Sequence, residues 1–149
     1  MSHSYCSNRV HVVFSTKERR KRIADDVQPR LWAYMAGIAS HHGFEAIKIG
    51  GIADHVHALL LLTANMPLSK AIQLLKGVSS KWLNETIFGG KFAWQEGYGA
   101  FSVSASHTDE VVEYIENQQA HHANRSFEEE FVMLLKKYGV TYDPVHVFG

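Results

Sequence analysis

Hydrophobic and polar residues follow two different spacings along this chain. Alternation with a period of two, or a short unbroken apolar run, predicts a β-strand, whereas apolar residues at i, i+3, i+4 and i+7 predict an amphipathic helix. From these spacings we expect four strands and four helices, in the order β-α-β-β-α-β followed by two further helices.

The stretches expected to form strands are rich in β-branched and aromatic residues and end in polar or glycine-containing turns. They cover residues 9–16, 44–51, 50–63 and 97–106. Gly50 and Gly51 are shared by the second and third stretches, and we expect this pair to turn the chain back between two strands.

Two helices are expected between the strands. Asp25 and Asp26 precede an apolar stripe that runs up to Gly43, and one of these carboxylates would cap the first turn of that helix. The second helix follows Pro67 and covers residues 68–88. Its apolar face carries Ala71, Leu75, Val78 and Trp82, at the spacing of a helix that packs against a core.

Two more helices are expected after the last strand. The first covers residues 107–122 and begins at Thr108 or Asp109. The second begins at Ser126, has a glutamate three residues later that completes a capping box, and ends at Gly139.

This order of elements is typical of the split βαβ, or ferredoxin-like, arrangement: an α+β fold with an RRM-like antiparallel sheet, here extended by C-terminal helices. In this topology the first and third strands are central neighbours and the fourth is an edge. The first two helices cover one face, and the other face is left for the third helix. The length of 149 residues fits a single domain over residues 1–149.

Composition and charge place the chain among ordinary globular proteins. It is 46% apolar and 20% charged, and it has no net charge when its histidines are neutral. No apolar run is long enough for a membrane helix, and the single cysteine, Cys6, excludes an intramolecular disulfide. We therefore expect a cytoplasmic protein without a membrane partner, and the neutral balance gives no general attraction to nucleic acid.

His55 and His57 are the first candidates for chemistry. Side chains alternate across a strand, so these imidazoles share one face of the third strand while Val56 and Ala58 point to the other. Their Cα atoms would lie roughly 6.5 to 7 Å apart, a separation from which both side chains can reach one cation. Two partly exposed histidines on an open sheet face explain the same pattern equally well.

Tyr114 and Gln118 lie four residues apart in the third expected helix, so they project from the same side of it. If that side lies over the histidine-bearing face, the Gln118 amide oxygen can bind the same cation and the Tyr114 hydroxyl can lie beside it. An ordinary packed aromatic is the alternative for Tyr114.

Four segments together resemble a known family. They are RVHVVFSTKERRKR (9–22), DHVHALL (54–60), FAWQEGYGAFSVS (92–104) and VVEYIENQQAHH (111–122). In this order they resemble the single-tyrosine HUH transposases of small insertion sequences, the IS200-like family. The resemblance implies a metal-dependent DNA transposase that cleaves and rejoins single-stranded DNA at hairpin-bearing element ends through a 5′-phosphotyrosine intermediate.

Carried over residue by residue, the resemblance implies that Tyr114 is the nucleophile. It also implies that His55, His57 and Gln118 are ligands of a divalent ion, Mg²⁺ or Mn²⁺. The implied partners are single-stranded DNA with hairpins and a second copy of the chain in a homodimer, and no small-molecule substrate is expected. Asp54 either orients a ligand or caps a turn, and we favour the structural role.

Other polar residues near these motifs receive weaker assignments. His11, His121 and His122 are placed where they could reach the site, but we favour solvated or packed histidines. Candidate phosphate-binding residues precede the first helix or lie on the second; they are Lys17, Arg19, Arg20, Lys21, Arg22, Lys76 and Lys81. Charge alone would make them solvated surface residues.

Two alternatives to an active transposase stay open. One is a domesticated or inactive relative that binds DNA hairpins without transposition. The other is a ferredoxin-like metal-binding or regulatory module whose tyrosine belongs only to the core.

Overall fold

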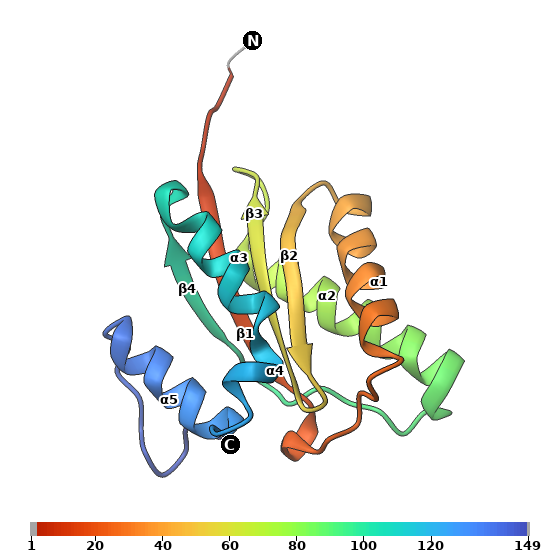
Figure 1. Cartoon of the computed structure of the whole chain (residues 1–149). Helices are drawn as coiled ribbons and strands as arrows, with labels where there is room; N and C mark the ends of the chain where they lie inside the picture. The colour runs from red at the N-terminus through yellow and green to blue at the C-terminus, as the bar shows by residue number, and fades with distance from the viewer. Residues whose placement is uncertain (1–2, 149) are drawn as a thin grey trace.

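A computed structural model describes residues 3–148 of the chain. Its central feature is a four-stranded antiparallel sheet in the order β2-β3-β1-β4 (Figure 1). The strands are β1 (Asn8–Ser15), β2 (Glu45–Ile52), β3 (His55–Leu62) and β4 (Gly99–Val103). The expected α+β, ferredoxin-like order is therefore confirmed, with β1 and β3 in the centre and β4 at an edge.

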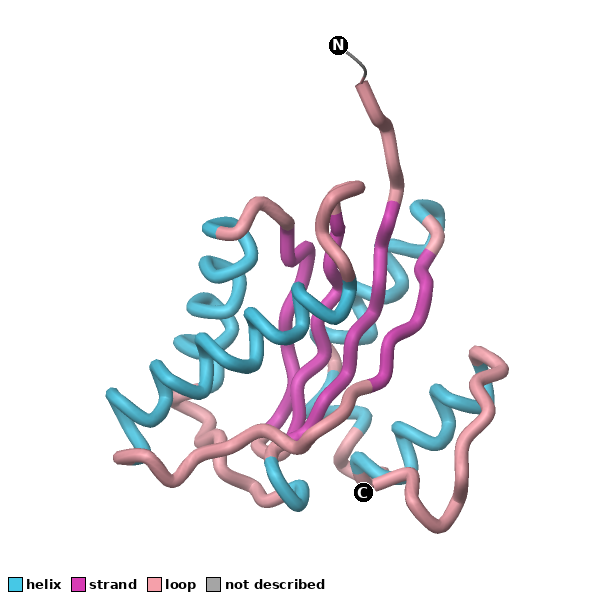
Figure 2. The backbone as a smooth tube through the Cα atoms, turned by 180° about the vertical axis from the view of Figure 1, so that it is seen from behind, coloured by secondary structure: helices cyan, strands magenta, loops and turns pink. Residues whose placement is uncertain are grey.

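Helices cover both faces of this sheet. One face carries α1 (Gln28–His41) and α2 (Leu68–Leu83), as Figure 2 shows. The other carries α3 (Thr108–Glu116), α4 (Gln118–His121) and α5 (Phe127–Lys137) (Figure 1). Three turns complete the elements: the 3₁₀ turns η1 (Lys17–Arg19) and η3 (Ala105–His107), and the π-helical turn η2 (Asn84–Phe88), which continues α2.

The face under α1 and α2 is a dry apolar core. Leu31 of α1 and Leu75 of α2 are fully buried against it. From β3 it receives four alternating side chains, Val56, Ala58, Leu60 and Leu62. Burying one such side chain stabilises a fold by roughly 1.5–3 kcal/mol. The alternation predicted for β3 and the apolar stripe predicted for α2 are therefore confirmed.

The start of α1 differs from its prediction. The helix begins at Gln28, and no side chain caps it. Pro29 lies in the first turn, where a backbone N–H has no partner within the helix. Proline lacks this N–H, so it fits there at no cost in hydrogen bonds. Asp25 instead accepts a hydrogen bond from the Gln28 side-chain amide at 3.3 Å. The expectation that Asp25 or Asp26 caps this helix was therefore wrong.

Gly50 and Gly51 lie inside β2, where both pair with β3, and the chain turns at Ala53 and Asp54. The turn predicted at the glycine pair was wrong. A Cβ atom at Gly50 would lie 2.8 Å from the backbone oxygen of Ile115 in α3. Glycine is needed here because α3 packs directly against the backbone of β2.

The C-terminal helices differ in continuity from the prediction. The single helix expected over residues 107–122 is broken at Asn117, which has φ −99° and ψ 24°. The capping box predicted for α5 is confirmed, since the Ser126 hydroxyl accepts a hydrogen bond from the Glu129 N–H at 3.1 Å. Within residues 3–148, none of the helices combines the length and the apolar character needed to cross a membrane.

Candidate metal and tyrosine site

The two histidines of β3 lie under helices. His55 and His57 are both 0% exposed, because α3, α4 and α5 cover this face of the sheet (Figure 1). Their ring centres are 5.0 Å apart, so the prediction that they share a face is confirmed. The alternative of two partly exposed histidines on an open face does not hold, and strand alternation alone could not decide it, because alternation shows which side chains share a face but not what packs on it.

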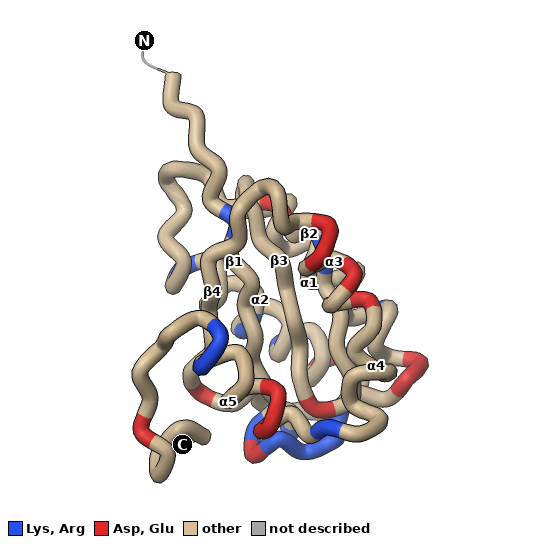
Figure 3. Tube along the Cα trace, turned by 60° about the vertical axis from the view of Figure 1, so that its left-hand side comes forward, with Lys and Arg blue, Asp and Glu red and all other residues tan. Residues whose placement is uncertain are grey.

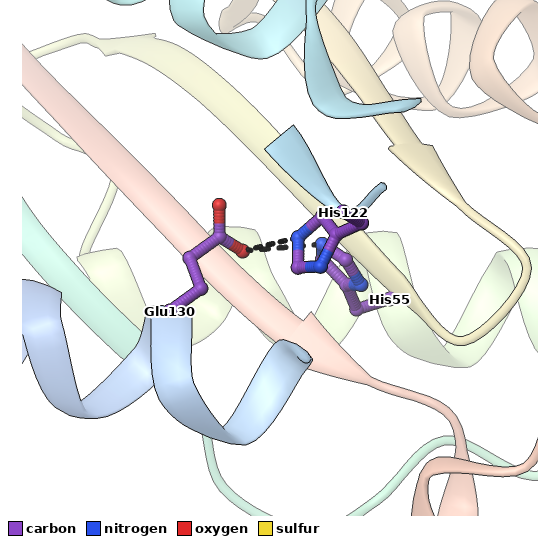
Figure 4. A group of neighbouring side chains, drawn as sticks. All are labelled: His55, His122 and Glu130. Carbon is purple, nitrogen blue, oxygen red and sulfur yellow. Dashed lines mark hydrogen bonds and ion pairs between the residues drawn. The ribbon is translucent and has the colours of Figure 1, made fainter. Parts of the chain in front are cut away.

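The carboxylate of Glu130, on α5, lies against these two histidines on the covered face and is 0% exposed. Its Oε1 atom accepts hydrogen bonds from the Nε2 atoms of His57 and His122, both at 3.0 Å. The Nε2 atom of His55 lies 3.3 Å from the same oxygen (Figure 4). Three imidazoles from two distant parts of the chain therefore converge on one buried oxygen.

The second ring nitrogen of each imidazole has a partner of its own. Nδ1 of His55 donates to the Asp54 carboxylate at 2.7 Å, and Nδ1 of His122 donates to a backbone carbonyl at 2.6 Å. Nδ1 of His57 accepts a hydrogen bond from Nε2 of His11 at 2.8 Å, because Nε2 of His57 already donates to the carboxylate. Such outer partners fix each ring and leave its Nε2 atom directed toward the centre.

Burial and hydrogen bonds set the charges in this cluster. Burial opposes charge on His55, but its hydrogen bonds to two carboxylates outweigh burial and raise its pKa to about 9. Burial lowers the pKa of His57 to about 4 and that of His11 to about 3. Burial alone would raise the pKa of Glu130, yet the hydrogen bonds from the imidazoles hold it far below its usual range. The cluster thus pairs an imidazolium with a carboxylate.

Tyr114 and Gln118 reach this carboxylate from either side of the break at Asn117. The Tyr114 hydroxyl and the Gln118 amide nitrogen both donate to Glu130 Oε2, the amide at 3.2 Å. The Gln118 amide oxygen lies 2.9 Å from Nε2 of His55. The predicted approach of both side chains to the histidines is therefore confirmed, and a single chain supplies all of them. Burial and the bond to Glu130 raise the pKa of the Tyr114 phenol above its ordinary value.

A cavity of about 580 Å³ borders Tyr114. It lies between β4, α3 and α5, and its lining includes His11, Ser102, His107, Lys137 and Tyr138. Tyr114 is half-buried and lines this cavity together with His11, whose ring is bonded to His57 of the imidazole cluster. The phenol can therefore meet a bound molecule on one side while its hydroxyl stays bonded to the cluster on the other.

The donor atoms of the cluster fit a divalent metal ion. Ligand atoms of His55, His122 and Glu130 all lie within 4.8 Å of one another. The predicted ligands His57 and Gln118 bond to the same atoms. Imidazole nitrogens bind first-row transition metals, of which Mn²⁺ binds least tightly, in preference to Mg²⁺, which takes oxygen ligands. The chain thus offers a candidate metal site made of three imidazoles, a carboxylate and an amide.

The basic cluster before α1 lies at the end of the sheet where β3 begins, near α4 and α5 (Figure 3). Its Arg22 N–H donates to the turn before β3 at 3.0 Å. Lys17 and Lys21 are exposed, and Arg20 pairs with Glu18 at 3.0 Å. The exposed lysines are the members of this cluster best placed to meet an external phosphate.

The other predicted phosphate-binding residues are engaged within the protein or lie far from the cluster. Arg19 and Arg22 lie over phenylalanine rings, 5.2 and 4.7 Å from the ring centres. Lys76 donates to two backbone carbonyls at 2.7 and 3.0 Å, and burial lowers its pKa. Lys81 is exposed on α2, which covers the opposite face of the sheet. DNA binding by these residues stays a prediction.

Glu130 was not predicted as a site residue. By charge alone it is one of three consecutive glutamates in α5. Its position nevertheless carries a signal, because Phe127, Glu130 and Leu134 follow the spacing of the buried stripe of that helix. A charged residue in such a stripe needs a partner, so the spacing marks Glu130 but does not identify its partners.

Several residues expected to be structural belong to the cluster. His11 and His122 bond to it directly, so the expectation that they are only solvated or packed was wrong. His121 stacks on the Tyr114 ring at 4.6 Å between ring centres. Asp54 orients His55, the role that we favoured less. These residues lie on separate elements, and no local pattern brings them together.

Comparison with known proteins identifies the family. The family model described as transposase IS200-like matches residues 4–118, well over half of the chain. The chain belongs to the IS200-like transposase family. The resemblance drawn from four sequence segments is thus confirmed, and this IS200-like transposase is assigned to a family of DNA-processing enzymes. The matched region ends at Gln118, so His122 and Glu130 lie outside it.

Two relatives agree with this assignment. The ISDra2 transposase TnpA of Deinococcus radiodurans is 29% identical over 115 residues, 72% of this chain and 81% of that protein. The transposase of insertion sequence element IS200 from Salmonella typhimurium is 26% identical over 124 residues, 79% of this chain and 81% of that protein.

Two solved structures share the fold. A crystal structure described as that of a transposase from D. radiodurans R1 has a TM-score of 0.63 and 26% identity, and covers 79% of this chain and 96% of that one. The structure of a REP-associated tyrosine transposase bound to a REP hairpin has a TM-score of 0.62 and 14% identity. The match covers 82% of this chain and 73% of that one.

Proposed function

We propose that this IS200-like transposase cleaves and rejoins single-stranded DNA by transesterification. Tyr114 is the proposed nucleophile, and His55, His57 and Gln118 are proposed ligands of a divalent ion. The observation that supports this most directly is the convergence of the imidazole cluster and the Tyr114 hydroxyl on one buried carboxylate.

The proposed reaction exchanges one phosphodiester bond for another. The Tyr114 Oη–P bond forms and the P–O3′ bond breaks, which leaves a 5′-phosphotyrosine and a free 3′-hydroxyl. The phenol gives up one proton and the departing 3′-oxygen takes one up. Because the link to tyrosine keeps the bond energy, the 3′-hydroxyl of another strand can reverse the step and join new ends.

The protonated, buried phenol of Tyr114 is a weak nucleophile on its own, since its pKa lies above the ordinary value. His55, His57 and Gln118 would hold the ion, with His122 and Glu130 available as further ligands. A divalent ion bound there would neutralise charge on the phosphate and make phosphorus more electrophilic. The imidazole nitrogens favour Mn²⁺ in affinity, and Mg²⁺ is the second candidate.

Single-stranded DNA would reach Tyr114 through the cavity beside it. Lys137 and His107 line that cavity, and the exposed Lys17 and Lys21 lie beyond the histidine end of β3. A strand that crosses the site can contact both regions, which suits binding through phosphates. Because the chain has no net charge, such binding depends on these local basic residues. The preference for hairpins is inferred from the structural neighbour that binds one.

We also infer a homodimer that forms through β4. This strand pairs with β1 on one side and is an edge of the sheet on the other. Residues Gly99–Val103 carry no charge that would discourage pairing with a second copy. Size-exclusion chromatography with light scattering measures the oligomeric state directly.

The cytoplasm is the compartment in which we expect the protein to act.

The test of the proposed reaction is a covalent product. Protein is mixed with Mn²⁺ and a single-stranded hairpin DNA labelled at its 3′ end, and adducts are separated on a denaturing gel. We expect an adduct that EDTA and Tyr114→Phe abolish, while Tyr34→Phe, the same change on the opposite face of the sheet, retains it. A DNA complex without an adduct would support the inactive, hairpin-binding relative, and no DNA binding would support the regulatory module.

A further inference from the structure

Glu130 connects the two parts of the proposed active site. Its Oε1 atom faces the imidazoles, and its Oε2 atom accepts the hydrogen bond from the Tyr114 hydroxyl. We infer that Glu130 is a positioning residue, whose carboxylate holds the Tyr114 phenol beside the ion site in the orientation needed for attack. This inference rests on the proposed role of Tyr114 as the nucleophile.

The carboxylate can hold the phenol because it is itself held firmly. Glu130 is fully buried, and α5 begins with a complete capping box at Ser126. A Cβ atom at Gly99 of β4 would lie 2.8 Å from the ring of Phe131, so α5 packs tightly on the sheet one residue after Glu130. A side chain on a packed helix positions a reacting group better than one on a mobile loop.

The hydrogen bond also fixes the direction from which the phenol can react. A phenol has one hydroxyl proton, and here that proton points to Glu130 Oε2. The oxygen lone pairs of Tyr114 therefore face away from the carboxylate, and a cavity of about 580 Å³ borders this residue. Gln118 donates to the same Oε2 atom at 3.2 Å and limits its movement.

A carboxylate in this place has a second interpretation with the opposite consequence. If Glu130 only occupied the position of a DNA phosphate, its negative charge would obstruct the substrate. Neutralising it would then increase the rate of attack. The positioning role requires a decrease, because displacement of a reacting group by about 1 Å costs roughly 100-fold in rate.

The deciding variant is Glu130→Gln, which keeps the shape of the side chain but removes the charge and one acceptor oxygen. Adduct formation is measured in single turnover at saturating Mn²⁺ and DNA, so that weaker ion binding does not mask the result. We expect a rate roughly 100-fold below that of the wild type, with unchanged DNA affinity. Glu128→Gln removes the same charge from an exposed position of α5 and should react at the wild-type rate. An unchanged or faster rate in Glu130→Gln would overturn the inference.

A spectroscopic readout separates this inference from the reaction itself. Tyrosines are labelled with ¹³C at Cζ, and spectra are recorded in EDTA without DNA. The Tyr114 resonance, assigned by its loss in Tyr114→Phe, should shift in Glu130→Gln and stay in place in Glu128→Gln. If the two variants show this pattern but the wild-type protein forms no adduct with DNA, the proposed reaction fails while the hydrogen bond between Tyr114 and Glu130 stands.

A second variant covers the case in which Glu130→Gln does not fold. Glu130→Asp keeps the charge but shortens the side chain by one methylene, so the carboxylate no longer reaches both the imidazoles and the phenol. We expect the same shift of the Tyr114 resonance and a slower adduct. A folded Glu130→Asp protein with the wild-type resonance and the wild-type rate contradicts the inference.

Discussion

The two faces of the central sheet are formed by the same strands but are stabilised in different ways. β3 sends Val56 and Leu60 into the dry core under α1 and α2, and His55 and His57 into the polar cluster under α3, α4 and α5. Burial does not distinguish them, since Leu60 and His57 are both 0% exposed. The faces differ in why burial of these side chains is tolerated.

On the dry face, removal of apolar side chains from water is itself favourable. Each buried side chain therefore adds to the free energy of unfolding without needing a polar partner. On the polar face, every buried polar group depends on a partner, because an unpaired buried polar atom is costly. Substitutions on the dry face should therefore change stability without changing the reaction. Those on the polar face should change the reaction more than stability.

His57→Asn should have the largest effect. It removes a proposed ion ligand, and the loss of several kcal/mol of charge stabilisation lowers adduct formation by about 1,000-fold or more. It also leaves the carboxylate of Glu130 and the ring of His11 short of one partner, which costs roughly 1–3 kcal/mol in the free energy of unfolding. The denaturing gel and urea denaturation measure the two effects. A wild-type rate of adduct formation would remove His57 from the site.

A matched pair on adjacent positions of β3 compares the faces directly. Leu60→Ala and Leu59→Ala each create a cavity and should lower the free energy of unfolding by about 2–5 kcal/mol. Leu59 packs with Ile115 under α3, whereas Leu60 lies in the dry core. Only Leu59→Ala should therefore slow adduct formation when both proteins are measured at a temperature at which they are folded. Equal slowing in the two variants would mean that the faces are not independent.

Mn²⁺ should stabilise the folded protein through the polar face alone. At a concentration 100 times its Kd, the ion adds about 2.7 kcal/mol to the free energy of unfolding. Thermal denaturation with and without Mn²⁺ measures this gain. We expect the gain in the wild type and in Leu60→Ala, and its loss in His57→Asn. A gain that survives in His57→Asn would place the ion elsewhere.

Gly50→Ala should disturb the site without altering a ligand. The new methyl group would meet Ile115 of α3 at 2.8 Å, and relief of this clash moves the helix that carries Tyr114. We expect a loss of about 1–3 kcal/mol in stability and a slower adduct. Gly37→Ala in α1 is the control, since nothing lies within 4 Å of its Cβ position, and it should stabilise the protein by about 0.5–1 kcal/mol. A neutral Gly50→Ala would show that α3 tolerates movement.

The two faces also differ in how far the sequence determines them. Alternation along β3 and the stripe of α2 place the dry core correctly, because apolar periodicity depends only on local geometry. The spacing of Tyr114 and Gln118 placed both near the histidines despite the break between them. The centre of the cluster was missed because Glu130 meets His57 across 73 residues of sequence. Only the docking of α5 onto the sheet brings them together.

We propose that imidazoles on the covered face of the sheet bind a divalent ion next to Tyr114. The most direct measurement is pulsed electron paramagnetic resonance of Mn²⁺ bound to protein that carries ¹⁵N-labelled histidine. We predict couplings from directly bound imidazole nitrogens, reduced in His57→Asn and retained in Leu60→Ala. A folded protein whose bound Mn²⁺ shows water ligands and no coupling to histidine nitrogen would contradict the account.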